Sequence, residues 1–157
     1  MENSIISGLL KVIEEQRRQI REIFGLSNEK LNWRPQAARN SIANLVEHIT
    51  GAEAFWIQEG IMGRSINRKR EREFEPHSRS RQELLTTYEN TAKATEQILN
   101  EKITDDQLFD ERVVRNRPRT ILWILLHLVD HSSYHIGQIE YIKGLFSSKN
   151  FQEPPST

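Results

Sequence analysis

The histidines of this 157-residue chain are the residues whose type and spacing point most directly to chemistry. His127, His131 and His135 follow one another at intervals of four residues, within an apolar stretch that has helical periodicity. In an α-helix each such step turns by about 40° and climbs by about 6 Å, so the three imidazoles form a ridge on one face. His48 lies on the apolar face of a second predicted helix. Ring nitrogens in a core need partners, and a shared divalent metal ion satisfies several at once.

Helix geometry limits which histidines can share one ion. Ligand nitrogens lie about 2 Å from zinc, so a pair at i and i+4 can converge on it, whereas three residues spanning about 12 Å of helix axis cannot. The ion would therefore be held by His48 and by either His127/His131 or His131/His135. Such a site leaves positions open for water or substrate, which is typical of catalytic metal sites. The competing interpretation gives the histidines hydrogen-bond partners in place of a metal ion: Asp130, Tyr134, Gln138 or the backbone.

Several other kinds of site are excluded. The chain has no cysteine, which removes disulfides, thiolate nucleophiles, cysteine-bound zinc and iron–sulfur clusters. A zincin needs Glu directly after the first histidine, where this chain has Leu128, and the string HLVDH has Asp where an inverted zincin has Glu. A di-iron carboxylate site needs Glu three residues before its histidines, and no candidate ligand has one. Motifs of the types GxSxG, P-loop and GxGxxG are absent.

Helical periodicity dominates the elements that must position these histidines. Apolar residues at three- and four-residue spacing predict helices at about 5–25, 41–60, 80–102 and 121–146. Helices of roughly 20 residues are about 30 Å long, and the predicted fold class is an all-α four-helix bundle. The connection between the second and third helices is long enough to let these two helices run parallel, and the connection before the fourth helix is similarly long. The strand-like run at 112–114 is too short to anchor a sheet.

Composition indicates one water-soluble domain. The 22 Lys and Arg residues balance 22 Asp and Glu residues, so no global attraction to nucleic acid or anionic membranes is implied. The longest apolar run, 121–126, is too short to cross a bilayer, and the N-terminus has no basic region typical of a signal peptide. We expect a single cytoplasmic domain over 1–157, with its core at 3–146 and a frayed tail at 147–157.

Two sequence blocks resemble a known family. The segment DHSSYHIGQI at 130–139 resembles the HxxxHxGQ signature of the DinB/YfiT-like superfamily of proposed metalloenzymes. The segment LNWRP at 31–35, followed by Ser41-Ile42 and by LVEHI at 45–49, resembles the first motif block of that superfamily. Order, spacing and helical placement agree over roughly residues 3–146.

This resemblance implies a four-helix bundle of up-down-down-up topology and a divalent metal ion, zinc or nickel, held by His48, His131 and His135. It also implies a homodimer. Characterised branches of the superfamily include S-transferases that use bacillithiol or mycothiol and a mycothiol-dependent maleylpyruvate isomerase. Many relatives have Arg directly after the second histidine of the signature, where this chain has Ile136. An activity that depends on that Arg therefore does not carry over.

The leading hypothesis is a metal-dependent transferase or hydrolase that acts on a small molecule. Because the chain has no cysteine, any thiolate would come from a low-molecular-weight thiol cosubstrate. His127, Tyr134 and Gln138 are the candidates to orient ligands or move protons, and of these only Gln138 belongs to the signature. The alternative is a non-catalytic metal- or ligand-binding protein of a stress response.

A third hypothesis, nucleic-acid binding, rests on a basic segment: Arg64, Arg68, Lys69, Arg70 and Arg72. Acidic residues at 71, 73 and 75 reduce the net charge of this segment to +2. We therefore expect a solvated connection with no nucleic-acid partner and no membrane partner, and His77 in the same charged region is expected to be solvated too.

Overall fold

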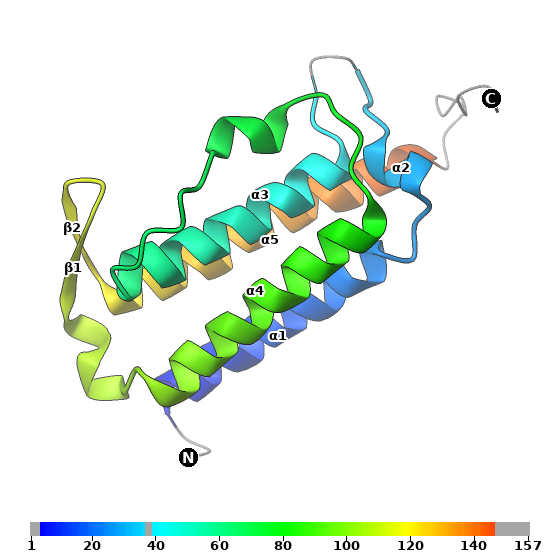
Figure 1. Ribbon diagram of the computed structural model, residues 1–157. Helices are drawn as coiled ribbons and strands as arrows, with labels where there is room; N and C mark the ends of the chain where they lie inside the picture. The colour runs from blue at the N-terminus through cyan, green and yellow to red at the C-terminus, as the bar shows by residue number, and fades with distance from the viewer. Residues whose placement is uncertain (1–3, 37–38, 147–157) are drawn as a thin grey trace.

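Residues 4–36 and 39–146 are described in the structure, a computed structural model of the chain (Figure 1). Its body consists of long helices: α1 (Ile5–Ile23), α3 (Ile42–Ala54), α4 (Arg81–Glu101) and α5 (Ile121–Phe146). Helix α3 packs against α4 and α5, and α1 packs against α5 and α4. The predicted all-α bundle is confirmed. The tail at 147–157, which was expected to be frayed, lies outside the described residues.

The long connection after the second predicted helix sets the helix directions. Helices α3 and α4 both start at the end of the bundle where the short helix α2 (Asn28–Asn32) lies, and α1 and α5 run the opposite way (Figure 1). Residues 62–80 return along α3 and include one 3-10 turn, η2 (Arg70–Phe74), that packs against it. This return path places η2 over the middle of α3.

The second predicted helix is longer than α3 alone. Its α-helical part ends at Ala54, and the chain continues as a π-helix, η1 (Phe55–Ile61). A π-helix has wider turns than an α-helix and is frequent at functional sites. The predicted range of 41–60 therefore covers two helical segments of different pitch.

The connection before α5 is more ordered than the sequence predicted. It contains a 3-10 turn, η3 (Asp105–Phe109), and an antiparallel hairpin of β1 (Glu111–Val114) and β2 (Arg117–Thr120). Arg115 and Asn116 form its turn with φ values of 52° and 61°, as a two-residue hairpin turn of type I′ requires. The run at 112–114 thus pairs locally, and the alternation that identifies strands is too short there to be recognised.

Serine side chains cap α3 and α4. Ser41 accepts the N–H of Asn44, and the Asn44 side chain accepts the N–H of Ser41, which completes a capping box at the start of α3. Ser80 caps α4 by accepting the N–H of Glu83. These contacts determine where the two helices begin.

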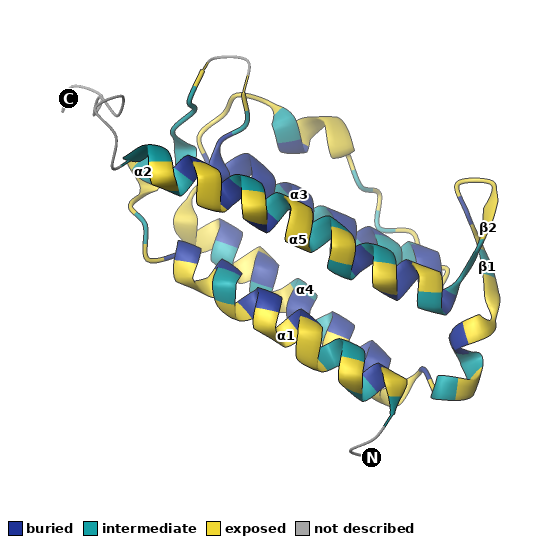
Figure 2. Cartoon of the chain, turned by 180° about the vertical axis from the view of Figure 1, so that it is seen from behind, coloured by how far each residue is buried: buried dark blue, intermediate teal, exposed yellow. Residues whose placement is uncertain are grey.

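The apolar core is divided into two clusters along the bundle (Figure 2). The cluster nearer the hairpin includes Ile57, Leu99, Leu108, Ile121, Ile124 and Leu125. The cluster nearer α2 includes Ile23, Leu31, Ile42, Val46, Tyr88 and Ile139.

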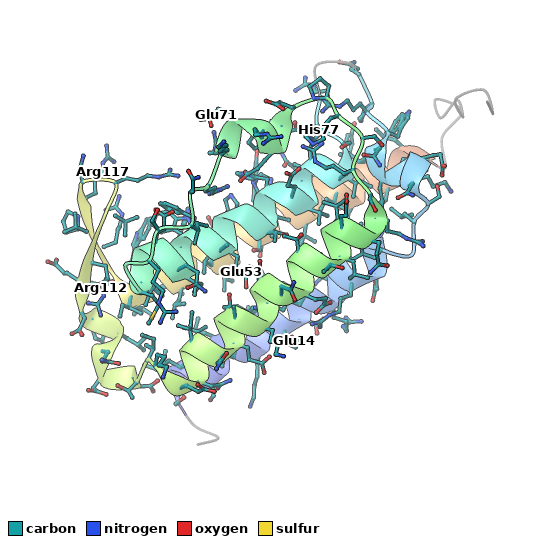
Figure 3. The ribbon with its side chains drawn as sticks, in the orientation of Figure 1. Glu14, Glu53, Glu71, His77, Arg112 and Arg117 are labelled. Carbon is teal, nitrogen blue, oxygen red and sulfur yellow. The ribbon has the colours of Figure 1, made fainter. Side chains whose placement is uncertain are left out.

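Buried polar side chains lie between these two clusters. Arg17 of α1 pairs with Glu53 of α3 at 2.7 Å, and Gln16 donates to the carbonyl of Val129 on α5 at 2.8 Å. Glu53 points from α3 into the middle of the bundle (Figure 3). The bundle therefore has a polar layer at mid-height, and His48 of α3 also lies near that level.

The buried ion pair gives a test of this layer. Glu53→Ala removes the near carboxylate of the Arg17 guanidinium, whose side chain is 4% exposed, and leaves only that of the exposed Glu14 at 4.0 Å. We expect the free energy of unfolding to fall by about 3–5 kcal/mol, as for other broken buried pairs, in urea denaturation. Glu15→Ala, which breaks an exposed pair with Arg18, is the control and should cost below about 1 kcal/mol. Equal losses in the two variants would contradict the assignment of a polar layer.

Candidate metal centre

Three imidazoles converge between α3 and α5. His48, His131 and His135 each offer a ring nitrogen, and these three atoms lie within 4.8 Å of one another. The Nε2 atoms of His48 and His131 are 3.0 Å apart. The ring centroids are 4.5 to 4.9 Å apart. The described residues thus contain a compact cluster of three candidate metal ligands.

Neighbouring side chains determine which ring nitrogens face the centre of the cluster. The Nδ1 of His48 is 2.7 Å from a carboxylate oxygen of Glu73, and the Nδ1 of His135 is 2.7 Å from the amide oxygen of Gln138. Both partners accept hydrogen bonds, and Glu73 lies nearer to the Nδ1 of His48 than the Arg68 guanidinium, a donor at 3.3 Å, so each Nδ1 is assigned as the donor. The Nε2 atoms of His48 and His135 are then the atoms available to the cluster, and in the neutral form of each ring they present a lone pair.

His127 lies outside this cluster, although the ridge on α5 includes it. Its ring stacks on Trp123 with a centroid distance of 4.9 Å and an interplanar angle of 10°, and it meets Trp56 edge-on at 5.0 Å. The centroid of its ring is 5.8 Å from that of His131. Of the two pairs that helix geometry left open, the structure brings His131/His135 to His48.

Glu73 is the functional residue that the sequence analysis missed. The connection at 62–80 was expected to be solvated, yet Glu73 is only 5% exposed and its carboxylate lies between His48 and Arg68. Arg68 donates to both carboxylate oxygens, at 2.6 and 2.8 Å. A Cβ at Gly51, one turn after His48, would clash with this carboxylate, so the glycine makes room for it. Nothing in the alternation of Glu and Arg at 70–75 distinguishes Glu73 from its neighbours.

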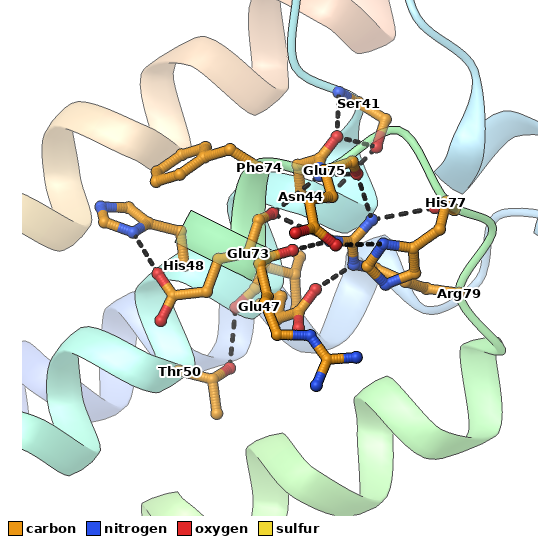
Figure 4. A network of polar contacts seen from close by, with 12 residues as sticks. Ser41, Asn44, Glu47, His48, Thr50, Glu73, Phe74, Glu75, His77 and Arg79 are labelled. Atoms are coloured by element: carbon orange, nitrogen blue, oxygen red, sulfur yellow. Dashed lines mark hydrogen bonds and ion pairs between the residues drawn. The ribbon is translucent and has the colours of Figure 1, made fainter. Parts of the chain in front are cut away.

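A polar network holds this connection against α3 (Figure 4). Asn44 donates to the carbonyls of Glu73 and Glu75, and buried Arg79 donates to the carbonyls of Glu73, Glu75 and His77. Arg79 also pairs with Glu47 of α3. The backbone around Glu73 is therefore fixed from two sides, which fixes the position of its carboxylate.

Burial and nearby charges favour the neutral form of His131 and His135. Burial, assisted by the neighbouring imidazoles and Arg68, lowers the pKa of His131 to about 3. Burial also lowers the pKa of His135, although the hydrogen bond to Gln138 opposes this. Burial alone would raise the pKa of Glu73, but the hydrogen bonds from His48 and Arg68 outweigh it and hold that pKa below its ordinary value. The cluster thus combines two imidazoles that favour the neutral form, which binds metals, with an ionised carboxylate behind His48.

The other candidate site residues surround the cluster. Gln138 contacts His135 directly, as described above, whereas the Tyr134 ring meets the His135 ring at 5.1 Å and is 65% exposed. Tyr134 and Gln138 both line a pocket of about 860 Å³. His77 is exposed, with Glu75 at 4.0 Å. Among the described residues no helix has the length and apolar character needed to span a membrane.

Comparisons with known proteins agree with this architecture. The family model described as "Protein of unknown function (DUF1572)" matches residues 3–154. A DinB-like protein from Bacillus cereus ATCC 10987 has a similar structure, with a TM-score of 0.72 and 17% identity over 100% of both chains. A conserved protein from Enterococcus faecalis is also similar, with a TM-score of 0.72 and 16% identity over 91% of this chain and 97% of the other. No curated protein sequence matches the chain.

The family match covers nearly the whole chain, and at these identities the two solved structures show a shared fold. That fold is the one implied by the HxxxHxGQ signature on α5. The chain belongs to the DUF1572 family, and it shares the fold of the DinB-like protein from Bacillus cereus.

Proposed function

We propose that the chain binds a divalent metal ion, zinc or nickel, through the Nε2 atoms of His48, His131 and His135. We further infer that the protein is a metal-dependent transferase or hydrolase that acts on a small molecule. A low-molecular-weight thiol is the candidate cosubstrate. The observation that carries the proposal is the convergence of the three ring nitrogens within 4.8 Å.

The donor set fits such an ion. Nitrogens bound to a tetrahedral ion at about 2.1 Å are separated by about 3.4 Å, close to the 3.0 Å between the Nε2 atoms of His48 and His131. A hydrogen bond between these two rings would satisfy them both. It would leave the Nε2 of His135 without a hydrogen-bond partner among the described residues, whereas a shared cation satisfies all three rings.

The chain supplies three ligands, so open positions remain for water, a thiol or a substrate. A divalent ion bound there lowers the pKa of a coordinated water or thiol toward neutrality. Glu73 and Gln138 fix the orientation of His48 and His135 by accepting their Nδ1 protons. Since the chain has no cysteine, a thiol reactant has to come from outside the protein. Transfer chemistry of this kind is the activity that the superfamily resemblance implies.

The three ligands can be tested one at a time. His48→Ala, His131→Ala and His135→Ala should each lose bound zinc or nickel in elemental analysis, because two imidazoles hold an ion far more weakly than three. His127→Ala and His77→Ala are the matched controls and should keep one ion per chain. Stoichiometric metal in all three ligand variants would refute the proposed site.

Glu73 should control metal affinity without binding the ion. Glu73→Gln removes the charge that His48 and Arg68 share, and we expect metal affinity to fall by about 10- to 100-fold, as for other partners of ligating histidines. Competition with a chromogenic chelator measures this. Glu75→Gln is the control, because the Glu75 side chain is exposed and only its backbone carbonyl joins the network. Equal affinities for Glu73→Gln and the unmodified chain would contradict the role of Glu73.

Catalysis is tested with a panel of thiols and electrophiles on the metal-loaded protein. We expect turnover by the metal-loaded protein. A chelator should abolish this turnover and added metal should restore it, and the His131→Ala variant should show none. A protein that binds metal stoichiometrically but converts no pair in the panel would favour the non-catalytic alternative, a metal- or ligand-binding role.

A further inference from the structure

The chain has no net charge, yet its cations gather in two segments near the histidine cluster. The hairpin at 111–120 has four arginines against one glutamate, and the segment at 64–75 has five cations against three glutamates. Figure 3 shows Arg112 and Arg117 on the hairpin and Glu71 on η2. The hairpin packs against η1 and the other segment packs against α3 through η2, so both segments border one continuous helical stretch.

Arginines from both segments lie over aromatic rings. The guanidinium carbon of Arg115 is 4.5 Å from the centroid of Phe55, and that of Arg68 is 5.9 Å from the same centroid. Arg119 lies over Trp123 at 4.3 Å. A guanidinium stacked on a ring keeps N–H groups at its edge available for a carboxylate or a phosphate.

These arginines differ in whether a carboxylate lies within ion-pair distance of the guanidinium. Arg68 pairs with Glu73 and supports His48, as described above. Within the described ranges 4–36 and 39–146, Arg115 and Arg119 have no carboxylate within ion-pair distance, and the one hydrogen bond from the Arg119 side chain goes to a backbone carbonyl. These two cations are therefore free to bind an anionic group.

A continuous aromatic surface connects the two arginines to the histidine cluster. The ring of Phe55 contacts Trp56 at 5.3 Å, and Trp56 contacts Trp123 at 5.7 Å. Trp123 stacks on His127, which in turn neighbours His131. Eight residues separate Trp123 from His131, about 12 Å along the helix axis. Trp123 is 39% exposed, so a ligand can reach this surface.

We propose that the ligand of the metal centre is an elongated small molecule with a carboxylate or phosphate at the end remote from the metal. Arg115 and Arg119 bind this anionic group, and the body of the ligand lies along the exposed edge of Trp123 and beside His127. The inference rests on the proposed function, because the metal anchors the other end. A small anion fits better than nucleic acid, because the free arginines meet at one aromatic surface beside the cluster and the chain as a whole carries no net charge.

The test compares two thiols that differ only in their far end. Mercaptooctanoate and mercaptooctanol are titrated into the zinc-loaded protein by calorimetry, since both present the same thiol to the metal. We expect the carboxylate to bind about tenfold more tightly, the effect of one charge-assisted hydrogen bond. Arg115→Gln and Arg119→Gln should each reduce that preference to about threefold or less, and the double variant should abolish it. The affinity for mercaptooctanol should stay unchanged throughout.

Arg81→Gln is the control for net charge, because Arg81 is exposed at the start of α4, at the opposite end of the bundle from the hairpin (Figure 1). It should leave the preference at about tenfold. Equal binding of the two thiols by the unmodified chain, or a preference that survives in the double variant, would overturn the proposal. So would tighter binding of a short DNA duplex than of mercaptooctanoate, which would assign the basic segments to nucleic acid.

The same samples separate this proposal from the proposed function. Elemental analysis shows whether each protein holds zinc, and a chain without zinc refutes the metal site alone. Octanoate is then titrated into the metal-free chain and followed by tryptophan fluorescence. Quenching that Arg115→Gln and Arg119→Gln weaken supports the two arginines independently of the metal. A fluorescence response that both variants retain in full refutes their role as well.

Discussion

The hydrogen bond between His48 and Glu73 is the contact on which the organisation of the site depends. It joins α3 to a connection that returns along the helix, and the absence of a side chain at Gly51 leaves space for the carboxylate. The same contact assigns the proton of His48 to Nδ1 and directs Nε2 toward α5. It also places the ring of Phe74 against His48, at 4.7 Å. The histidine cluster and the path of the connection are therefore parts of one structure.

The location of the cluster follows from the division of the core. Two apolar clusters supply the burial that stabilises the bundle, and the polar layer with Arg17 and Glu53 lies between them. Buried ion pairs recover little of their desolvation cost, so this layer adds little to stability compared with apolar packing of the same volume. The polar layer already interrupts the apolar packing of the core. Three imidazoles grouped at this level therefore cause the smallest further loss of core packing.

Local charge matters more than net charge in this molecule. The chain has equal numbers of acidic and basic residues, and for that reason it was expected to exert no global electrostatic attraction. The hairpin changes the situation locally, because its turn carries Arg115 to the ring of Phe55 and its second strand carries Arg119 to Trp123. The cations beside the cluster thus depend on a small element that sequence periodicity did not predict.

The sequence alone determined the helices and the ridge of histidines on α5, because helical periodicity depends on residues a few positions apart. Helix α5 has the predicted bounds, and α4 differs from its prediction by a residue at each end. Residue spacing left two histidine pairs open and the family resemblance implied His131/His135, but only the tertiary structure shows that this pair meets His48, 83 positions before His131. It also decided that Glu73, 25 positions from His48, is buried as its partner, and that the hairpin reaches Phe55. Such contacts depend on how helices and connections pack together, and packing leaves no periodic signal in the chain.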